Sequence, residues 1–155
     1  MSAVSIRPAD ASDIAFIREQ YVHVEENGAP PWRHEGPSPY TDAWIEHVID
    51  NAPDDQAIFL AVDDAGTRLG YTWVLSLLEF DTVIPHGHIA GVGVADAARG
   101  RGIGSLLVSA AEDWCRSKEL PEVTLHCYVA NEGAHRLYGR LGFEDEWYHM
   151  RKGLT

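Results

Sequence analysis

A six-residue turn in the second half of the chain has the composition of an anion-binding site. Residues 99–104 read Arg-Gly-Arg-Gly-Ile-Gly and open a strongly amphipathic helical pattern. The first turn of a helix leaves backbone N–H groups without partners and carries about half a positive charge. Glycines let those N–H groups converge on an anion that no side chain obstructs. Two arginines at this turn, in a chain of formal charge −12, favour a bound phosphate group.

Two familiar phosphate-binding patterns do not fit this turn. The P-loop requires Lys followed by Ser or Thr after its last glycine, whereas Gly104 is followed by Ser105 and Leu106. The dinucleotide pattern G-x-G-x-x-G fails because the glycines stand at every second position. What remains is Arg-x-x-Gly-x-Gly after a predicted strand that ends Val-Gly-Val. A tight strand-to-helix turn without a ligand is the alternative interpretation.

A second pattern follows the glycine turn. The spacing N-x-x-A-x-x-x-Y-x-x-x-G-F is matched by Asn131, Ala134, Tyr138, Gly142 and Phe143. Residues 99–104 match the pattern Q/R-x-x-G-x-G/A. With both motifs in this order, the sequence resembles the GNAT superfamily of acyl-CoA-dependent N-acyltransferases. The resemblance is clear from His88 to Phe143 and implies acetyl-CoA as co-substrate. No metal is expected, because His86 and His88 form an H-x-H pair without a third ligand at a telling spacing.

The resemblance also implies how acetyl-CoA would be held. Backbone N–H groups of the glycine turn would bind its pyrophosphate, and the main chain of the preceding strand would pair with its pantetheine arm. Asn131 would contact that arm, and it is also placed to cap the last helix. The residues expected to bind the cofactor are Val92, Val94, Arg99, Gly100, Arg101, Gly102, Ile103, Gly104, Ser105, Asn131 and Ala134.

Acetyl transfer to an amine calls for a base and a proton donor. An alkylammonium with a pKa near 10.4 must lose a proton before it attacks, and the departing thiolate must gain one. The resemblance gives Tyr138 the donor role, although its apolar stripe also suits core packing. The family often places Glu where this chain has His88, whose ordinary pKa near 6.5 suits a base. Glu79 and Asp81 are rivals that would act through water.

We therefore expect an N-acetyltransferase that works by direct attack in a ternary complex. Its acceptor would be a primary amine: a small amine, an amino acid, an aminoglycoside-like compound or a protein amine. Acidic pairs such as Glu25-Glu26 favour a cationic acceptor. A non-catalytic CoA-binding module and a protein-interaction domain that uses the loop 27–39 are the alternatives. Trp32, Tyr40 and Trp44 would line the acceptor pocket or fill the core.

The predicted elements give an α+β (α/β) fold with a mixed, mostly antiparallel sheet and helices on both faces, in the order βααβββαβαβ. Strands are expected over 5–7, 57–62, 69–78, 88–94, 123–129 and 143–154. Helices are expected after the cap Asp10, around Trp44, from Ile103 and from Asn131. Alternation over 88–94 would place His88, Ala90, Val92 and Val94 on one face and Ile89, Gly91 and Gly93 on the other.

Composition limits the other function classes. The 155 residues, 45% apolar and 23% charged, suit one domain over 1–155. With 24 acidic against 12 basic residues, binding to nucleic acids or anionic membranes is disfavoured. Two cysteines without paired spacing indicate reduced thiols, and the lack of a signal peptide or long apolar run favours the cytoplasm. The resemblance implies a homodimer as one arrangement.

Overall fold

The computed structural model describes residues 3–26, 29, 39–78, 83–150 and 152–154. The chain begins with β1 (Val4–Pro8), a short 3-10 turn η1 (Ala11–Asp13), α1 (Ile14–Glu26) and α2 (Pro39–Asn51). Three strands follow: β2 (Gln56–Asp63), β3 (Arg68–Leu77) and β4 (His86–Val94). The last elements are η2 (Asp96–Ala98), α3 (Ile103–Ser117), β5 (Val123–Leu125) and α4 (Glu132–Arg140).

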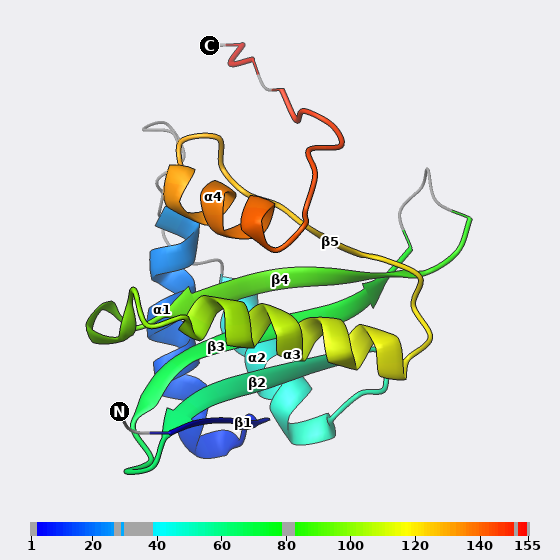
Figure 1. Ribbon diagram of the computed structural model, residues 1–155. Coiled ribbons are helices and arrows are strands. Elements are labelled where there is room, and N and C mark those ends of the chain that lie inside the picture. The colour runs from blue at the N-terminus through cyan, green and yellow to red at the C-terminus, as the bar shows by residue number, and fades with distance from the viewer. Residues whose placement is uncertain (1–2, 27–28, 30–38, 79–82, 151, 155) are drawn as a thin grey trace.

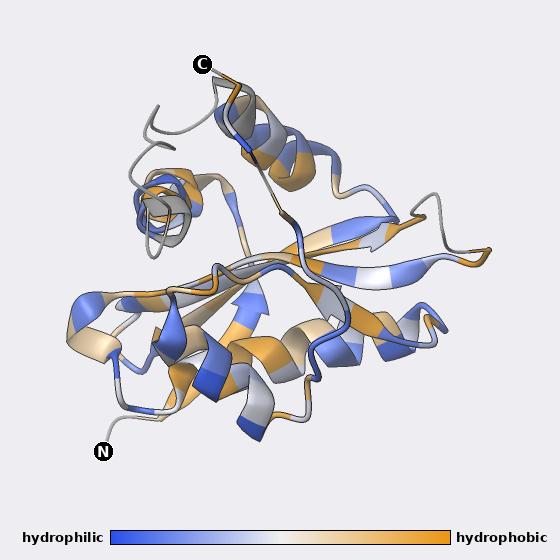
Figure 2. Ribbon diagram, turned by 90° about the horizontal axis from the view of Figure 1, so that it is seen from above, coloured by the Kyte–Doolittle hydropathy of each residue, from blue (hydrophilic) through white to orange (hydrophobic). Residues whose placement is uncertain are grey.

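The strands form one sheet in the order β1-β2-β3-β4-β5. Neighbours pair antiparallel, except that β4 and β5 run parallel. Seen from above, the sheet lies between helices on either side (Figures 1 and 2). The predicted α+β class with a mixed, mostly antiparallel sheet is therefore confirmed.

Each face of the sheet has its own apolar core. On the α1–α2 face, Ile17 and Ile45 pack against Leu60, Tyr71 and Trp73. On the α3–α4 face, the regular apolar spacing of α3 buries residues against β3 and β4; these include Leu107, Val108, Ala111, Val74 and Ile89. The partly buried Tyr138 and Leu141 of α4 join this second core.

A β-bulge in β4 corrects the predicted alternation of its side chains. Trp73 pairs with Gly91 while Val74 pairs with Ile89, so β4 carries one extra residue at Ala90. Ala90 packs with the α1–α2 core, whereas Val92 packs with the α3–α4 core. A Cβ at Gly91 would lie 2.8 Å from the Tyr71 hydroxyl oxygen, on the α1–α2 face. His88 and Val92 therefore lie on opposite faces, because strict alternation fails at a bulge.

Asp13 ties the start of α1 to two strands. Its carboxylate is fully buried and accepts hydrogen bonds from Arg7 of β1 at 2.7 and 2.9 Å and from Arg68 of β3 at 2.6 Å. It also accepts from the backbone N–H of Asp10, whose own side chain caps the turn, as predicted. These partners hold the pKa of Asp13 far below its usual range, although burial opposes them. Every charge in this cluster has a partner.

The last third of the chain contains less strand than predicted. Over 123–129, only Val123–Leu125 pairs with β4, because the chain leaves β4 after that point. The closing strand predicted over 143–154 is wrong: the described residues of this segment form no strand. Among the described residues, β5 covers only Val123–Leu125, so it offers this segment no longer edge to pair with. It runs from α4 past the coil that follows β5 (Figure 1).

Candidate active site

The site begins where the parallel strands β4 and β5 stop pairing. Gly87, His88 and Ile89 pair with Val123, Thr124 and Leu125, but β4 continues to Val94 without a partner on that side among the described residues. In Figure 1, the chain after β5 rises away from β4 toward α4. Backbone groups on this edge of residues 90–94 are therefore available to an extended ligand, which could bind as an added strand.

The glycine turn lies at the end of the same strand. Gly100 and Gly102 adopt φ of +73° and +78°, a conformation that favours glycine, and a Cβ at either would meet nothing within 4 Å. Gly102 is the N-cap of α3, and Leu106 N donates to Gly102 O at 3.2 Å. The N–H groups of residues 103–105 thus precede the first intrahelical bond. This turn fits the predicted anion site.

The arginines and Gly104 also have structural roles. Arg99 is exposed and pairs with Asp96 at 2.9 Å. Arg101 lies close enough to Asp63 to help lower the pKa of that carboxyl, although hydrogen bonds from Thr67 lower it more. A Cβ at Gly104 would lie 3.0 Å from Cδ2 of Leu137. Gly104 therefore lets α4 approach the first turn of α3.

Helix α4 places Tyr138 on the α3–α4 side of the gap. Its ring packs on Phe143 at 5.7 Å, so the predicted packing role holds. Burial, followed by the nearby Cys127, raises the pKa of Tyr138 to about 12. The phenol is therefore protonated at neutral pH and suited to donate.

Asn131 caps α4 by accepting from Ala134 N at 3.2 Å, as predicted. Both cysteines are unpaired.

Three histidines gather on the α1–α2 side of the same gap. His86 and His88 are two residues apart on β4, and His126 follows β5 with its ring 4.8 Å from that of His88. Thr124 pairs with His88, and its Oγ1 lies 2.8 Å from His88 Nδ1. Thr124 and His126 thus lie on one face of the chain, and Cys127, near Tyr138, lies on the other.

Burial and neighbouring histidines set the protonation of His88. Desolvation comes first, and His126 and His86 add repulsion, so that the pKa of His88 falls to about 4. The imidazole is therefore neutral at pH 7. Thr124 Oγ1 donates to Gly87 O at 3.4 Å and can accept from His88 Nδ1 at 2.8 Å. That chain of hydrogen bonds leaves Nε2 with a lone pair.

The structure describes only some of the remaining predicted residues. Glu79, Asp81 and Trp32 fall outside the described residues, as does most of the loop 27–39. Trp44 is half-exposed and contacts His47 edge-on at 5.8 Å.

Among the residues that the structure describes, no group of three or more potential ligands could hold a metal ion. None of the described helices has the length and apolar character needed to cross a membrane.

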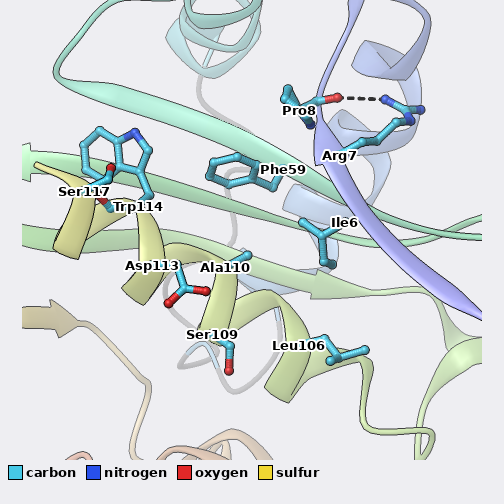
Figure 3. Close-up of a pocket in the computed structure, with 10 residues that line it drawn as sticks. All are labelled: Ile6, Arg7, Pro8, Phe59, Leu106, Ser109, Ala110, Asp113, Trp114 and Ser117. Carbon is cyan, nitrogen blue, oxygen red and sulfur yellow. Dashed lines mark hydrogen bonds between the residues drawn. The ribbon is translucent and has the colours of Figure 1, made fainter.

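A separate apolar groove of about 530 Å³ lies between α3 and the strands β1 and β2 (Figure 3). Ile6, Phe59, Ala110 and Trp114 are among its lining residues. None of the predicted catalytic or cofactor-binding residues lines it. The candidate site is therefore the gap between β4 and β5 and not this groove.

Sequence reasoning missed two contributors, Thr124 and Trp147. Thr124 is found only through the parallel register of β4 and β5. Trp147 contacts the ring of His126 at 5.7 Å, although they are far apart in the chain. The sequence offers no local pattern for either contact, because both depend on where the chain separates from β4.

A sheet that opens between two parallel strands, beside a glycine-rich helix N-terminus, is the architecture of the N-acetyltransferase fold class. The chain belongs to the Acetyltransferase (GNAT) family, whose model matches residues 18–143. This confirms the resemblance seen in the two motifs.

Particular relatives support the same family. Over 90 residues the chain is 37% identical to mycothiol acetyltransferase of Thermobispora bispora, covering 57% of this chain and 30% of that protein. It thus spans less than a third of that curated relative.

Two solved structures share the fold. A protein from Bacillus halodurans aligns with a TM-score of 0.80 at 18% identity, covering 97% of this chain and 99% of that one. Aminoglycoside N-acetyltransferase AAC(6')-Iy in complex with CoA aligns at 0.77 and 19%, covering 100% and 97%.

Proposed function

We propose that the protein transfers an acetyl group from acetyl-CoA to a primary amine in a ternary complex. The observation that carries this proposal is the gap between β4 and β5. It has a neutral buried imidazole on one side, a protonated phenol on the other, and a glycine-rich helix N-terminus at the end of the same strand.

The cofactor would lie along the free edge of β4. Backbone groups of Val92 and Val94 would pair with the pantetheine arm, and N–H groups from Arg101 to Ser105 would bind the pyrophosphate. The positive φ of Gly100 and Gly102 and the open space at their Cβ positions support this arrangement. The thioester would then lie where the two strands diverge.

The chemical step needs one proton acceptor and one donor. The neutral amine attacks the thioester carbonyl carbon, a C–N bond forms, and the C–S bond breaks. His88 Nε2 takes the proton that the amine nitrogen gives up, directly or through water, and the Tyr138 hydroxyl donates a proton to the departing thiolate. Because the pKa of His88 is about 4, this imidazole is unprotonated throughout the neutral range. His88 then releases its proton to water and the Tyr138 phenolate takes one from water, so both groups return to their starting states.

The first experiment separates cofactor binding from chemistry. Ser105→Glu places a carboxylate in the first turn of α3, where it suits the helix dipole but repels pyrophosphate. Ser109→Glu makes the same change one turn further along the same helix and serves as the matched control. We expect acetyl-CoA to raise the melting temperature of the native protein and of Ser109→Glu, but not of Ser105→Glu.

Thiol release from acetyl-CoA with a panel of primary amines then tests the reaction. A saturable rise in melting temperature without thiol release would favour a non-catalytic CoA-binding module. The absence of any such rise at millimolar acetyl-CoA would overturn the proposal. An equal loss of the thermal shift in both glutamate variants would show that the cofactor does not bind specifically at the glycine turn.

A further inference from the structure

A row of aromatic and imidazole rings leads from the candidate base to the surface. The ring of His88 lies 4.8 Å from that of His126, which lies 5.7 Å from the indole of Trp147. His149 lies 6.1 Å beyond Trp147. The rings come from β4, from the segment after β5 and from the C-terminal segment, so the fold and not local sequence brings them together.

This row lies on one side of the reacting centre. His88 and His126 are on the α1–α2 side of the gap, whereas Tyr138, which would protonate the thiolate, is on the α3–α4 side. The acceptor amine must approach the base and not the leaving group. Trp147 is therefore two ring contacts from His88, on the side from which the amine approaches.

Trp147 is only half-covered, with 51% of its surface exposed. Packing on His126 holds the indole in place while part of the ring stays open. A positioned indole is the best aromatic partner for a cation. The same segment carries Glu144 and Glu146, both exposed, whereas Asp145 is already bonded to His135 at 2.9 Å. Glu146 directly precedes Trp147, whereas Lys152 follows five residues later, so the carboxylate nearest to the indole in the chain favours a positive ligand group.

We infer that Trp147 determines acceptor specificity by binding a second cationic group of the acceptor, while its primary amine reacts beside His88. The substrate class is thus a diamine, a polyamine or an amino compound with a further charged nitrogen. This inference rests on the proposed acetyl transfer and adds the chemical class of the acceptor.

The test compares two amines that differ only in the second charge. Putrescine has an ammonium group at each end, and n-butylamine has the same carbon chain with one. In the native protein, kcat/KM should be about 10-fold higher for putrescine. In Trp147→Ala that ratio should fall toward one through a higher KM for putrescine, with kcat changed less than about 3-fold and n-butylamine unaffected. Trp147→Phe should keep part of the preference.

Tyr148→Ala is the matched control, because it removes an adjacent exposed aromatic side chain. It should leave the ratio unchanged. A native ratio near one, a ratio unaltered in Trp147→Ala, or acetylation of other amines but neither of these two would overturn the inference while leaving acetyl transfer intact. If instead no amine releases thiol and acetyl-CoA causes no thermal shift, it is the proposed function that fails.

Discussion

Two clusters of ionisable groups, each built around a buried member, lie at different places in this sheet and differ in how their polar groups are paired. Around Asp13, every charged group is paired, with two arginines and a backbone N–H on one carboxylate. Around His88, the ionisable groups are all histidines, which repel one another if charged. One of them, His86, is 1% exposed, and neither of its ring nitrogens has a hydrogen bond among the described residues. Hydrogen-bonded buried groups stabilise the fold. Buried groups without a partner cost stability, so their retention points to a functional role.

The strongest test of this contrast breaks the satisfied cluster. Asp13→Ala removes the carboxylate that Arg7 and Arg68 share and should lower the free energy of unfolding by about 3 kcal/mol. The control Asp54→Ala removes a fully exposed carboxylate that lies 3.9 Å from Lys118 and should change it by less than about 0.5 kcal/mol. Urea denaturation measures both.

The acid dependence of Asp13 has a definite sign. Because its pKa is lowered by folding, its contribution is full above the unfolded value near 3.9 and is lost as the pH falls below it. The stability gap between native protein and Asp13→Ala should therefore shrink below about pH 4. A gap independent of pH would show that the carboxylate acts through packing alone.

The second test removes the proposed base from the histidine cluster. His88→Gln should lower kcat by about 100-fold with little change in acetyl-CoA binding. Thr124→Val should also lower kcat, because His88 then loses the partner that holds its Nδ1 proton. An undiminished rate in both variants would transfer the role of base to another group.

The pH profile reports the protonation of His88 directly. A pKa of about 4 means that His88 stays neutral between pH 5.5 and 8, so over that range the profile follows loss of the proton from the amine and not from His88. The logarithm of kcat/KM should then rise with a slope of about one. A slope near two below pH 6.5 would show a base with the ordinary histidine pKa. The same lowered pKa means that His88 costs stability as the pH falls from about 6.5 toward 4.

A smaller effect is expected on the other side of the gap. Tyr138→Phe keeps the ring that packs on Phe143 but removes the hydroxyl. We expect kcat to fall about 10-fold, with stability and acetyl-CoA binding nearly unchanged. An unaltered kcat would leave Tyr138 with its packing role alone.

Sequence reasoning was strongest where a local pattern determines structure. The periodicity of α3 and the glycines of its first turn predicted both the helix and the turn, because helix spacing and positive φ depend on neighbouring residues. It failed at Ala90, since a bulge is defined only against the partner strand β3. It also overextended the last strands and missed Thr124 and Trp147, whose contacts depend on where β5 separates from β4.

The smallest expected effect has the opposite sign to that of Asp13. His86→Leu replaces an imidazole, whose nitrogens have no hydrogen-bond partner within the described part of the chain, with an apolar side chain of similar volume. The free energy of unfolding should therefore stay constant or rise by about 1 kcal/mol. Repulsion from His86 also contributes to the lowered pKa of His88, so in His86→Leu that pKa should move upward. A loss of more than about 2 kcal/mol would reveal a hydrogen-bond partner of His86 in solution and would place this histidine with the satisfied groups. A rise in stability together with a fall in kcat would instead show that the unpaired ring serves the reaction at the cost of the fold.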